Sequence, residues 1–165
     1  MLPIRTILHP TDFSERSNYA FRCACSLTRD YGARLIVLHV YTPLLVGSPE
    51  GVALQSATED KEALREQFQQ LQPRDPNVQM ECRVVEGDPA TEILRAAEET
   101  KCDVIVLGTH GRTGLSRLLL GSVAEQVVRR ALCPVVTIKT PLRQAVSAEE
   151  PASATAVGQG VAPAG

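Results

Sequence analysis

A glycine-rich loop is the strongest chemical pattern in the 165-residue sequence. It begins with Gly108-Thr109-His110-Gly111, and Gly121-Ser122 come after nine further residues. Glycine lets main-chain N–H groups approach an anion closely, and the start of a helix near Ser122 would add free N–H groups and a partial positive charge. The loop therefore predicts a phosphate cradle. The alternative is that these glycines only form turns.

Other side chains in and near the loop leave several interpretations open. Arg112 and Arg117 are either counter-charges for a phosphate or plain surface charges. His110 would lie beside the phosphate or act as a general base. His9, His39 and His110 all fall near the ends of predicted strands, which allows a three-histidine metal site, although no carboxylate–histidine spacing supports one. The Leu118–Leu120 run is either core or a partner surface.

The sequence lacks the features that would indicate a well-known nucleotide motif or strong catalysis. The Gly-x-x-x-x-Gly-Lys-Ser/Thr loop is absent, and no Gly-x-Gly-x-x-Gly follows the first predicted strand. No acid pair stands out, and no base is positioned to activate water. The sequence thus predicts binding with no catalytic residue. A slow ATPase, or a nucleotidyl- or phosphoryl-transfer enzyme, is the competing hypothesis.

The hydrophobic pattern predicts the elements that position this loop. Apolar runs predict buried strands at 6–9, 34–41, 103–107 and 134–138, and the alternation over 78–85 predicts an edge strand. In that edge strand Val78, Met80, Cys82 and Val84 would face inward. Helical spacing follows each of the first four strands, so the order β-α-β-α-β-α-β-α-β predicts an α/β fold with an open, five-stranded parallel sheet. Ligands of such sheets bind beyond the carboxyl ends of the strands.

Local signals add boundaries to these elements. Asp12 and Ser14 are both plausible caps for the first helix, whose apolar stripe would be Ala20, Cys23, Ala24, Leu27 and Tyr31, with Gly32 as its end. Asp88 would cap the third helix, and Asp103 would have a structural role at the start of a strand. Residues 42–55 have no periodicity and predict a long loop.

Composition excludes several classes of protein. The net charge is −2 and no basic block occurs, which argues against nucleic-acid binding. No signal peptide and no apolar run of about 18 residues is found, which predicts a cytoplasmic protein without a membrane span. The five cysteines form no Cys-x-x-Cys pair, so we expect reduced thiols, with a zinc or redox role as the alternative.

Several segments together resemble the universal stress protein family, in its ATP-binding branch. They are Ile-Leu-His-Pro-Thr-Asp-Phe-Ser at 7–14, Leu-His-Val-Tyr at 38–41, Gly-Asp-Pro-Ala-Thr-Glu-Ile-Leu at 87–94, Asp-Val-Ile-Val-Leu-Gly-Thr-His-Gly-Arg-Thr-Gly at 103–114 and Cys-Pro-Val-Val at 133–136. The glycine loop also matches the Gly-x-x-Gly-x9-Gly-Ser pattern of that branch. The resemblance covers residues 1–140 and implies a flavodoxin/Rossmann-like strand order of 3-2-1-4-5.

The resemblance also implies a role for each matching position. Asp12 would bind the ribose, with capping of the first helix as the alternative. Pro10 and Thr11 would line the adenosine pocket, and Val40 would contact adenine. ATP, with Mg²⁺, would be held at its phosphates by the residues of the glycine loop and the following helix: Gly108, Thr109, His110, Gly111, Arg112, Gly121, Ser122 and Val123.

The family further implies assembly and a cellular role. Its members pair through the last strand, so we expect a twofold homodimer through Val135, Val136, Thr137 and Ile138. The expected function is that of an ATP-dependent sensor or regulator in stress response. A nucleotide-free dimeric interaction module is the alternative, against which the intact glycines argue. Residues 141–165 are predicted to be a disordered tail rich in Ala, Pro and Gly.

Overall fold

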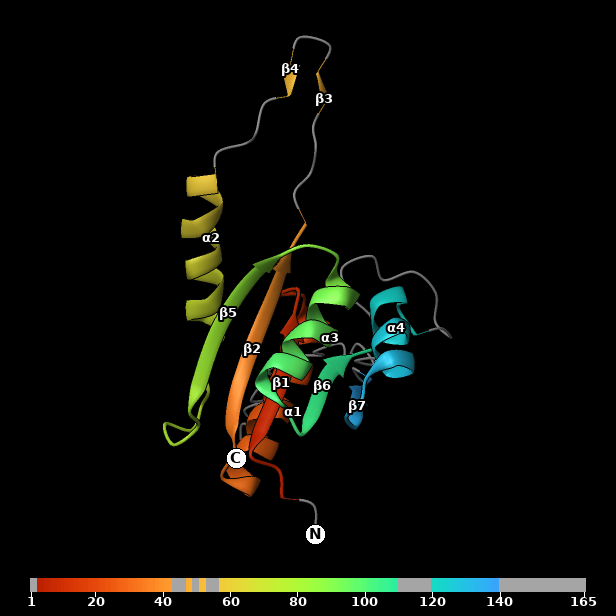
Figure 1. Ribbon diagram of the computed structural model, residues 1–165. Coiled ribbons are helices and arrows are strands. Elements are labelled where there is room, and N and C mark those ends of the chain that lie inside the picture. The colour runs from red at the N-terminus through yellow and green to blue at the C-terminus, as the bar shows by residue number, and fades with distance from the viewer. Residues whose placement is uncertain (1–2, 43–46, 49–50, 53–56, 110–119, 140–165) are drawn as a thin grey trace, which may run out of the picture.

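The computed structural model describes residues 3–42, 47–48, 51–52, 57–109 and 120–139 (Figure 1). Strands and helices alternate along these residues. The main sheet contains β1 (Thr6–Thr11), β2 (Arg34–Tyr41), β5 (Met80–Glu86), β6 (Val104–Gly108) and β7 (Val135–Ile138). The helices are α1 (Glu15–Tyr31), α2 (Ala57–Gln70), α3 (Pro89–Thr100) and α4 (Ser122–Arg130).

The main sheet is open and entirely parallel, with the order β5-β2-β1-β6-β7. This confirms the predicted order 3-2-1-4-5 of the five main strands. The order reverses at β1, which therefore lies between β2 and β6 at the centre of the sheet. In such folds the point of reversal opens a crevice at the carboxyl ends of the central strands.

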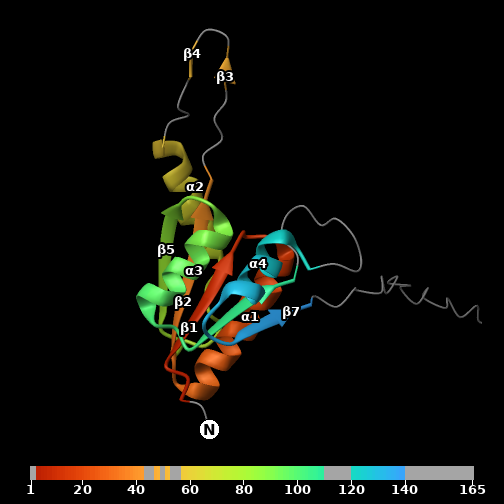
Figure 2. The ribbon, with the colours of Figure 1, turned by 45° about the vertical axis from the view of Figure 1, so that its right-hand side comes forward.

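Two hydrophobic cores cover the two faces of the sheet. On one face α3 and α4 pack on residues such as Leu8, Ile36 and Ile105. On the other face α1 and the end of α2 pack on Ile7 and Val37, among others. Figures 1 and 2 show the sheet between these two layers, with α3 and α4 together on one side. The central strands β1, β2 and β6 are mostly buried because both of their faces are covered.

Side chains fix several element boundaries as the sequence predicts. The hydroxyl of Ser14 accepts a hydrogen bond from the N–H of Ser17 and is the N-cap of α1. Asp88 caps α3 by accepting from the N–H and hydroxyl of Thr91. The carboxylate of Asp103 accepts from the N–H groups of Arg5 and Thr6, at 2.8 and 2.9 Å, and so ties the start of β6 to β1.

Two predicted boundaries are wrong. The first strand does not end at His9 but continues through Pro10 to Thr11. A proline is tolerated at position 10 because the N–H that it lacks would point toward β6, and the pairing of β1 with β6 has already ended at Leu8. Within the segment 42–55, predicted to be a loop, Gly47–Ser48 (β3) and Gly51–Val52 (β4) pair as a short antiparallel ladder.

Two predicted buried faces also need correction. In α1 the buried residues are Ser17, Ala20, Phe21, Ala24 and Thr28, whereas Tyr31 is exposed. Ser17 and Thr28 on that face hydrogen-bond through their hydroxyls within the protein, so a pattern of apolar residues does not find them. β5 lies at an edge as predicted, but Cys82 and Val84 are exposed because the core on their face extends only to Val78 and Met80.

Two other predictions concern a membrane-spanning helix and the C-terminal segment. Among the described residues, no helix is long and apolar enough to cross a membrane. The predicted disordered tail, residues 141–165, lies outside the described residues and stays a prediction.

Candidate functional site

A cavity of about 350 Å³ lies at the carboxyl ends of the central strands. Its walls come from the ends of β1, β2 and β6 and from the first turns of α1, α3 and α4. The predicted site residues that line it are Pro10, Thr11, Asp12, Val40, Gly108, Thr109, Gly121, Ser122 and Val123. Its size is that of a small-molecule site, and such sites are usually concave and mostly apolar with a few placed polar groups.

The cavity opens where the central ladder ends early. β1 pairs with β2 as far as Thr11, but it pairs with β6 only as far as Leu8. The carbonyl of Thr6 faces β6, because it accepts from the N–H of Asp103, and alternation turns Pro10 toward β6 as well. Pro10 has no N–H to donate across that seam. The proline thus ends the β1–β6 ladder at the mouth of the cavity.

A tight turn after β1 holds Asp12 at the mouth of the cavity. One carboxylate oxygen, Oδ1, accepts from both the N–H and the hydroxyl of Ser14, at 3.1 and 2.7 Å. Phe13 in the same turn has a φ of 60°, a left-handed conformation that is unusual for an aromatic residue. Its ring packs against His39 and, edge to face, against Phe68. Strained residues of this kind concentrate at functional sites, where the surrounding structure fixes them.

The hydroxyl network behind this turn joins α1 to the end of β1. Ser17 donates its hydroxyl to Oγ1 of Thr11 at 3.0 Å, and Thr11 Oγ1 also accepts from the N–H of Phe13. Thr11 and Ser17 are both buried. The polar atoms at the back of the cavity are therefore fixed before any ligand arrives.

His9 comes just before the cavity-lining Pro10 in β1, does not itself line the cavity and is completely buried. Its Nδ1 is 2.8 Å from the carbonyl oxygen of Val106. A carbonyl can only accept, so Nδ1 carries the proton and donates. Burial lowers the pKa of His9 to about 4, although the hydrogen bond to Val106 and the charge of Asp12 act in the opposite direction. His9 is a neutral core residue at physiological pH.

The three-histidine metal hypothesis gains no support from the described residues. His39 places its Nδ1 2.9 Å from the carbonyl oxygen of Thr11, and this carbonyl also accepts. Among the described residues, no three His, Cys, Asp or Glu side chains form a group that could hold a metal ion. His110 lies outside the described residues. In both described histidines, Nδ1 is hydrogen-bonded to a backbone carbonyl oxygen.

The N-terminus of α4 faces the cavity without a side-chain cap. Gly121 occupies the N-cap position and, among the residues that the structure describes, no side chain caps this turn, whereas Ser14 caps α1 and Asp88 caps α3. The N–H of Gly121 itself donates to the carbonyl oxygen of Thr109 at 2.8 Å, which ties the two ends of the glycine loop together. The N–H groups of Ser122 and Val123 then belong to the uncapped first turn, whose partial positive charge favours an anion.

Some predicted residues fall outside the described part, and some lining residues were not predicted. His110, Gly111 and Arg112 lie outside the described residues. The lining residues that sequence reasoning missed are Ser17, Leu38, His39, Pro89, Ile93, Leu107 and Ala124. Pro89 and Ile93 are four apart at the start of a helix that follows a strand end, and this position was the available signal.

The start of α3 reaches the cavity because of a close backbone turn at Gly87. Its φ is 150°, and a Cβ there would lie 2.8 Å from Cγ of Glu92. The N–H of Gly87 donates to the carbonyl oxygen of Tyr41 at 2.9 Å, which binds this turn to the end of β2. A larger side chain at this position would be strained at this φ and would meet the side chain of Glu92.

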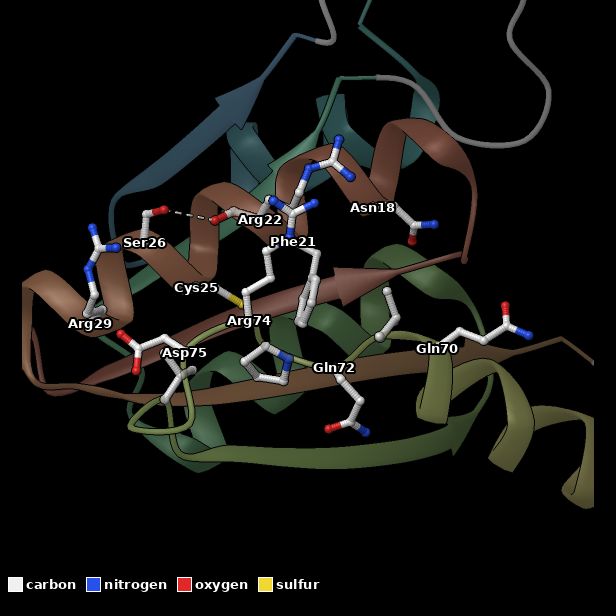
Figure 3. Close-up of a pocket in the computed structure, with 13 residues that line it drawn as sticks. Asn18, Phe21, Arg22, Cys25, Ser26, Arg29, Gln70, Gln72, Arg74 and Asp75 are labelled. Atoms are coloured by element: carbon white, nitrogen blue, oxygen red, sulfur yellow. Dashed lines mark hydrogen bonds between the residues drawn. The ribbon is translucent and has the colours of Figure 1, made fainter.

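A second cavity, of about 410 Å³, lies on the α1 face of the sheet (Figure 3). It is bounded by one stripe of α1, with Phe21, Arg22 and Cys25, and by the connection from α2 to β5. Ser26 on its rim donates its hydroxyl to the carbonyl of Arg22. None of the predicted site residues within the described ranges lines it, and it is not at the strand carboxyl ends. The smaller cavity is therefore the candidate site.

Comparison with known proteins agrees with this fold. The sequence profile described as "Universal stress protein family" matches residues 3–139. The chain is 36% identical over 146 residues to "Universal stress protein MJ0531" of Methanocaldococcus jannaschii, which covers 85% of each protein.

Two similar solved structures contain adenine nucleotides. One is a universal stress protein in complex with cAMP, with 26% identity, a TM-score of 0.62 and coverage of 84% of this chain and 98% of that one. The other is the universal stress protein of Archaeoglobus fulgidus in complex with dAMP, with 25% identity, a TM-score of 0.58 and coverage of 84% and 100%. The matching profile, the relative and the shared fold lead to one conclusion: this chain belongs to the universal stress protein family.

Proposed function

We propose that the chain binds ATP in the cavity at the strand carboxyl ends and acts as a cytoplasmic sensor or regulator in stress response. The observation that carries this proposal is the lining of one cavity by Asp12, Val40 and the two ends of the glycine loop. Similar proteins bind cAMP and dAMP, which supports an adenine nucleotide as the ligand class.

The strand order supports a definite direction for the nucleotide. β1 lies between β2 and β6, so Asp12 after β1 lies between Val40 of β2 and Gly108 of β6. The β2 side of the cavity carries the apolar residues Val40, Pro89 and Ile93 together with His39. The β6 side offers glycines, Ser122 and the start of α4. The base would lie on Val40, the ribose at Asp12 and the phosphates at the glycine loop.

Mg²⁺ would arrive with the nucleotide. The described residues hold no group of three acidic, histidine or cysteine side chains that could bind a metal ion alone. Magnesium commonly keeps most of its waters and binds through substrate phosphates with one or two protein oxygens. Its part would be to neutralise phosphate charge. The proposal is for binding, and no described side chain is assigned to hydrolysis.

A homodimer through β7 is part of the same proposal. β7 is an edge strand, and Val136 on it is 36% exposed. Leu132, just before the strand, is 88% exposed, and Val128 on α4 is 43% exposed. An apolar edge of this kind invites pairing with a second copy, and isologous pairing gives a twofold dimer.

The test begins with protein that has never been exposed to added nucleotide. Freshly purified protein is denatured by heat, and any released nucleotide is identified by chromatography. Emptied protein is then titrated with ATP, ADP, AMP and cAMP by calorimetry, with and without Mg²⁺. We expect ATP with Mg²⁺ to bind most tightly. Absence of both released nucleotide and binding at millimolar ATP would overturn the proposal, and tighter binding of AMP or cAMP would overturn its choice of ATP.

A further inference from the structure

Two cysteines lie together at the end of the sheet opposite the candidate site. Sγ of Cys102 is 3.7 Å from Sγ of Cys133, although the two residues are 31 apart in the sequence. All five cysteines are free thiols. Among the described residues, no other pair of sulfur atoms forms a comparable contact, so this pair stands apart from Cys23, Cys25 and Cys82.

The two thiols are held together by neighbouring strands. Cys102 follows the C-cap of α3 and comes two residues before β6, while Cys133 comes two residues before β7. β6 and β7 are paired in parallel, with Ile105 opposite Val135, and the N–H of Ile105 donates to the carbonyl of Pro134. The N–H of Cys102 donates to the carbonyl of Ala97. This ladder and helix end hold the two thiols adjacent.

From this geometry we infer that Cys102 and Cys133 form a covalent modification site, at which a peroxide oxidises the two thiols to an intramolecular disulfide. A disulfide has a sulfur–sulfur distance of about 2.05 Å, so the two atoms must approach by about 1.7 Å, within the reach of side-chain rotation. The inference does not depend on nucleotide binding, because neither residue lines the candidate site.

Exposure decides the order of the reaction. Cys133 is partly exposed, whereas Cys102 is only 6% exposed. Burial, with a smaller effect of Cys133, raises the pKa of Cys102 to about 12, so this thiol stays protonated and meets solutes poorly. Cys133 is therefore the thiol that meets the oxidant, and Cys102 is the one that resolves it.

The reaction has two balanced steps. The sulfur of Cys133 attacks one peroxide oxygen, the O–O bond breaks, Cys133 becomes a sulfenic acid, and the other oxygen leaves as water with the thiol proton. The thiol of Cys102 then attacks the sulfur of Cys133 while its proton passes to the departing hydroxyl, so the S–S bond forms and a second water leaves. The two thiols lose two electrons in total, and these reduce the peroxide. Proximity favours the second step over attack by an outside thiol.

The bond would close a ring that contains the glycine loop. Residues 102–133 include β6, the segment from Gly108 to Ser122, and α4. A covalent link across a ring of this length restricts the unfolded chain, and we expect the melting temperature to rise on the order of 5–10 °C. Oxidation would thus stabilise the half of the sheet that carries the loop.

The experiment treats the reduced full-length chain with a small molar excess of hydrogen peroxide and maps it by mass spectrometry. Trypsin cuts after Lys101, Arg112, Arg130 and Lys139, so peptides 102–112 and 131–139 each contain one cysteine of the pair. We expect a cross-linked pair of these two peptides, a whole-protein mass lower by two hydrogens, and a raised melting temperature that dithiothreitol reverses.

Cysteine-to-serine variants identify which thiols form the cross-link. Cys133→Ser should abolish the cross-link, and Cys82→Ser, at an exposed thiol on the other edge, should leave it unchanged. Cys102→Ser repeats the first result, and if this buried substitution prevents folding, Cys133→Ser alone decides. The inference is overturned if both thiols persist while Cys82 is oxidised. A cross-link between two chains, or one involving another cysteine, overturns it as well.

Discussion

The imidazole of His9 donates its Nδ1 proton to the carbonyl oxygen of Val106, 2.8 Å away across the seam between β1 and β6. If the ladder continued beyond Leu8, its register would place the N–H of residue 10 opposite this same carbonyl. Residue 10 is a proline, so the histidine side chain supplies the missing donor. His9 and Pro10 together let the sheet open at the cavity without leaving the Val106 carbonyl unpaired.

This arrangement predicts a specific dependence of stability on pH. The pKa of His9 is about 4 in the folded state and 6.5 in the unfolded state. Between these values only the unfolded state binds the proton, so the contribution of His9 is complete above pH 6.5 and is lost as the pH falls toward 4. The wild type should lose about 2 kcal/mol between pH 7 and pH 5 through this group.

The measurement is urea unfolding of the wild type and of His9→Gln at the two pH values. Glutamine keeps a donor for the Val106 carbonyl but does not titrate, so the variant should lack this part of the pH dependence. Carboxylates titrate equally in both proteins and cancel in the difference. Equal pH dependence of the two proteins would refute the assignment of a neutral buried histidine.

The ribose role proposed for Asp12 predicts a loss of ATP affinity on substitution. Charge-assisted hydrogen bonds contribute about 1.5–3 kcal/mol each, so Asp12→Ala should weaken ATP binding by roughly 10- to 150-fold in calorimetry. Asp12→Asn keeps an acceptor for Ser14 and should have a smaller effect.

Ser14→Ala is the matched control for Asp12. It removes the cap of α1 and one bond to Oδ1 of Asp12, but it leaves the carboxylate in place. We expect ATP affinity to change by less than about threefold while stability falls by about 1 kcal/mol. If Ser14→Ala weakens binding as much as Asp12→Ala, the carboxylate acts through the turn and not on the ligand.

The proposed dimer predicts that the two edges of the sheet respond differently to the same change. Lysine on an edge strand opposes strand pairing. Val136→Lys on β7 should therefore convert the dimer to a monomer in light scattering coupled to gel filtration. Val84→Lys on β5, where Val84 is 48% exposed, should leave the dimer intact. A dimer that survives the first change and not the second would place the interface on the opposite edge.

Two helix ends provide a prediction about backbone strain. Gly32 after α1 has a φ of 61°, and Lys101 after α3 has a φ of 50° in the same role. A Cβ on Gly32 would contact nothing within 4 Å, so Gly32→Ala should cost only backbone strain, about 1 kcal/mol. Lys101→Gly should relieve such strain and stabilise by up to about 1 kcal/mol. Urea unfolding measures both, and equal signs for the two changes would contradict the argument.

The parallel sheet could be predicted because strands and helices alternate along the sequence and because β1, β2 and β6, which are buried on both faces, read as apolar runs. The strand order was implied by the family resemblance and not by this pattern. Ser17 and Thr28 explain why the buried face of α1 could not be predicted. Their hydroxyls bond to Thr11 Oγ1 and to the carbonyl of Ala24, so these polar residues are inside without cost in unpaired groups. A pattern that counts apolar residues places such a face wrongly.

The candidate site was predictable where a residue type has a special backbone role and not where it only packs. Glycines and Asp12 stand out in the sequence, and the structure brings the described ones to one cavity. Ile93 and Ala124 are ordinary apolar residues of helix faces. They line the cavity only because α3 and α4 begin at the same end of the sheet, and that is a property of tertiary packing.

The missing amide proton of Pro10 also affects the free energy of ligand entry. A cavity that a protein must open before binding carries a reorganisation free energy, which lowers affinity and slows association. Here Pro10 offers no N–H across the gap between β1 and β6, so closing the gap would form one hydrogen bond fewer than ordinary strand pairing does. The cavity is preorganised, and a ligand that fits it needs no prior rearrangement of the central strands.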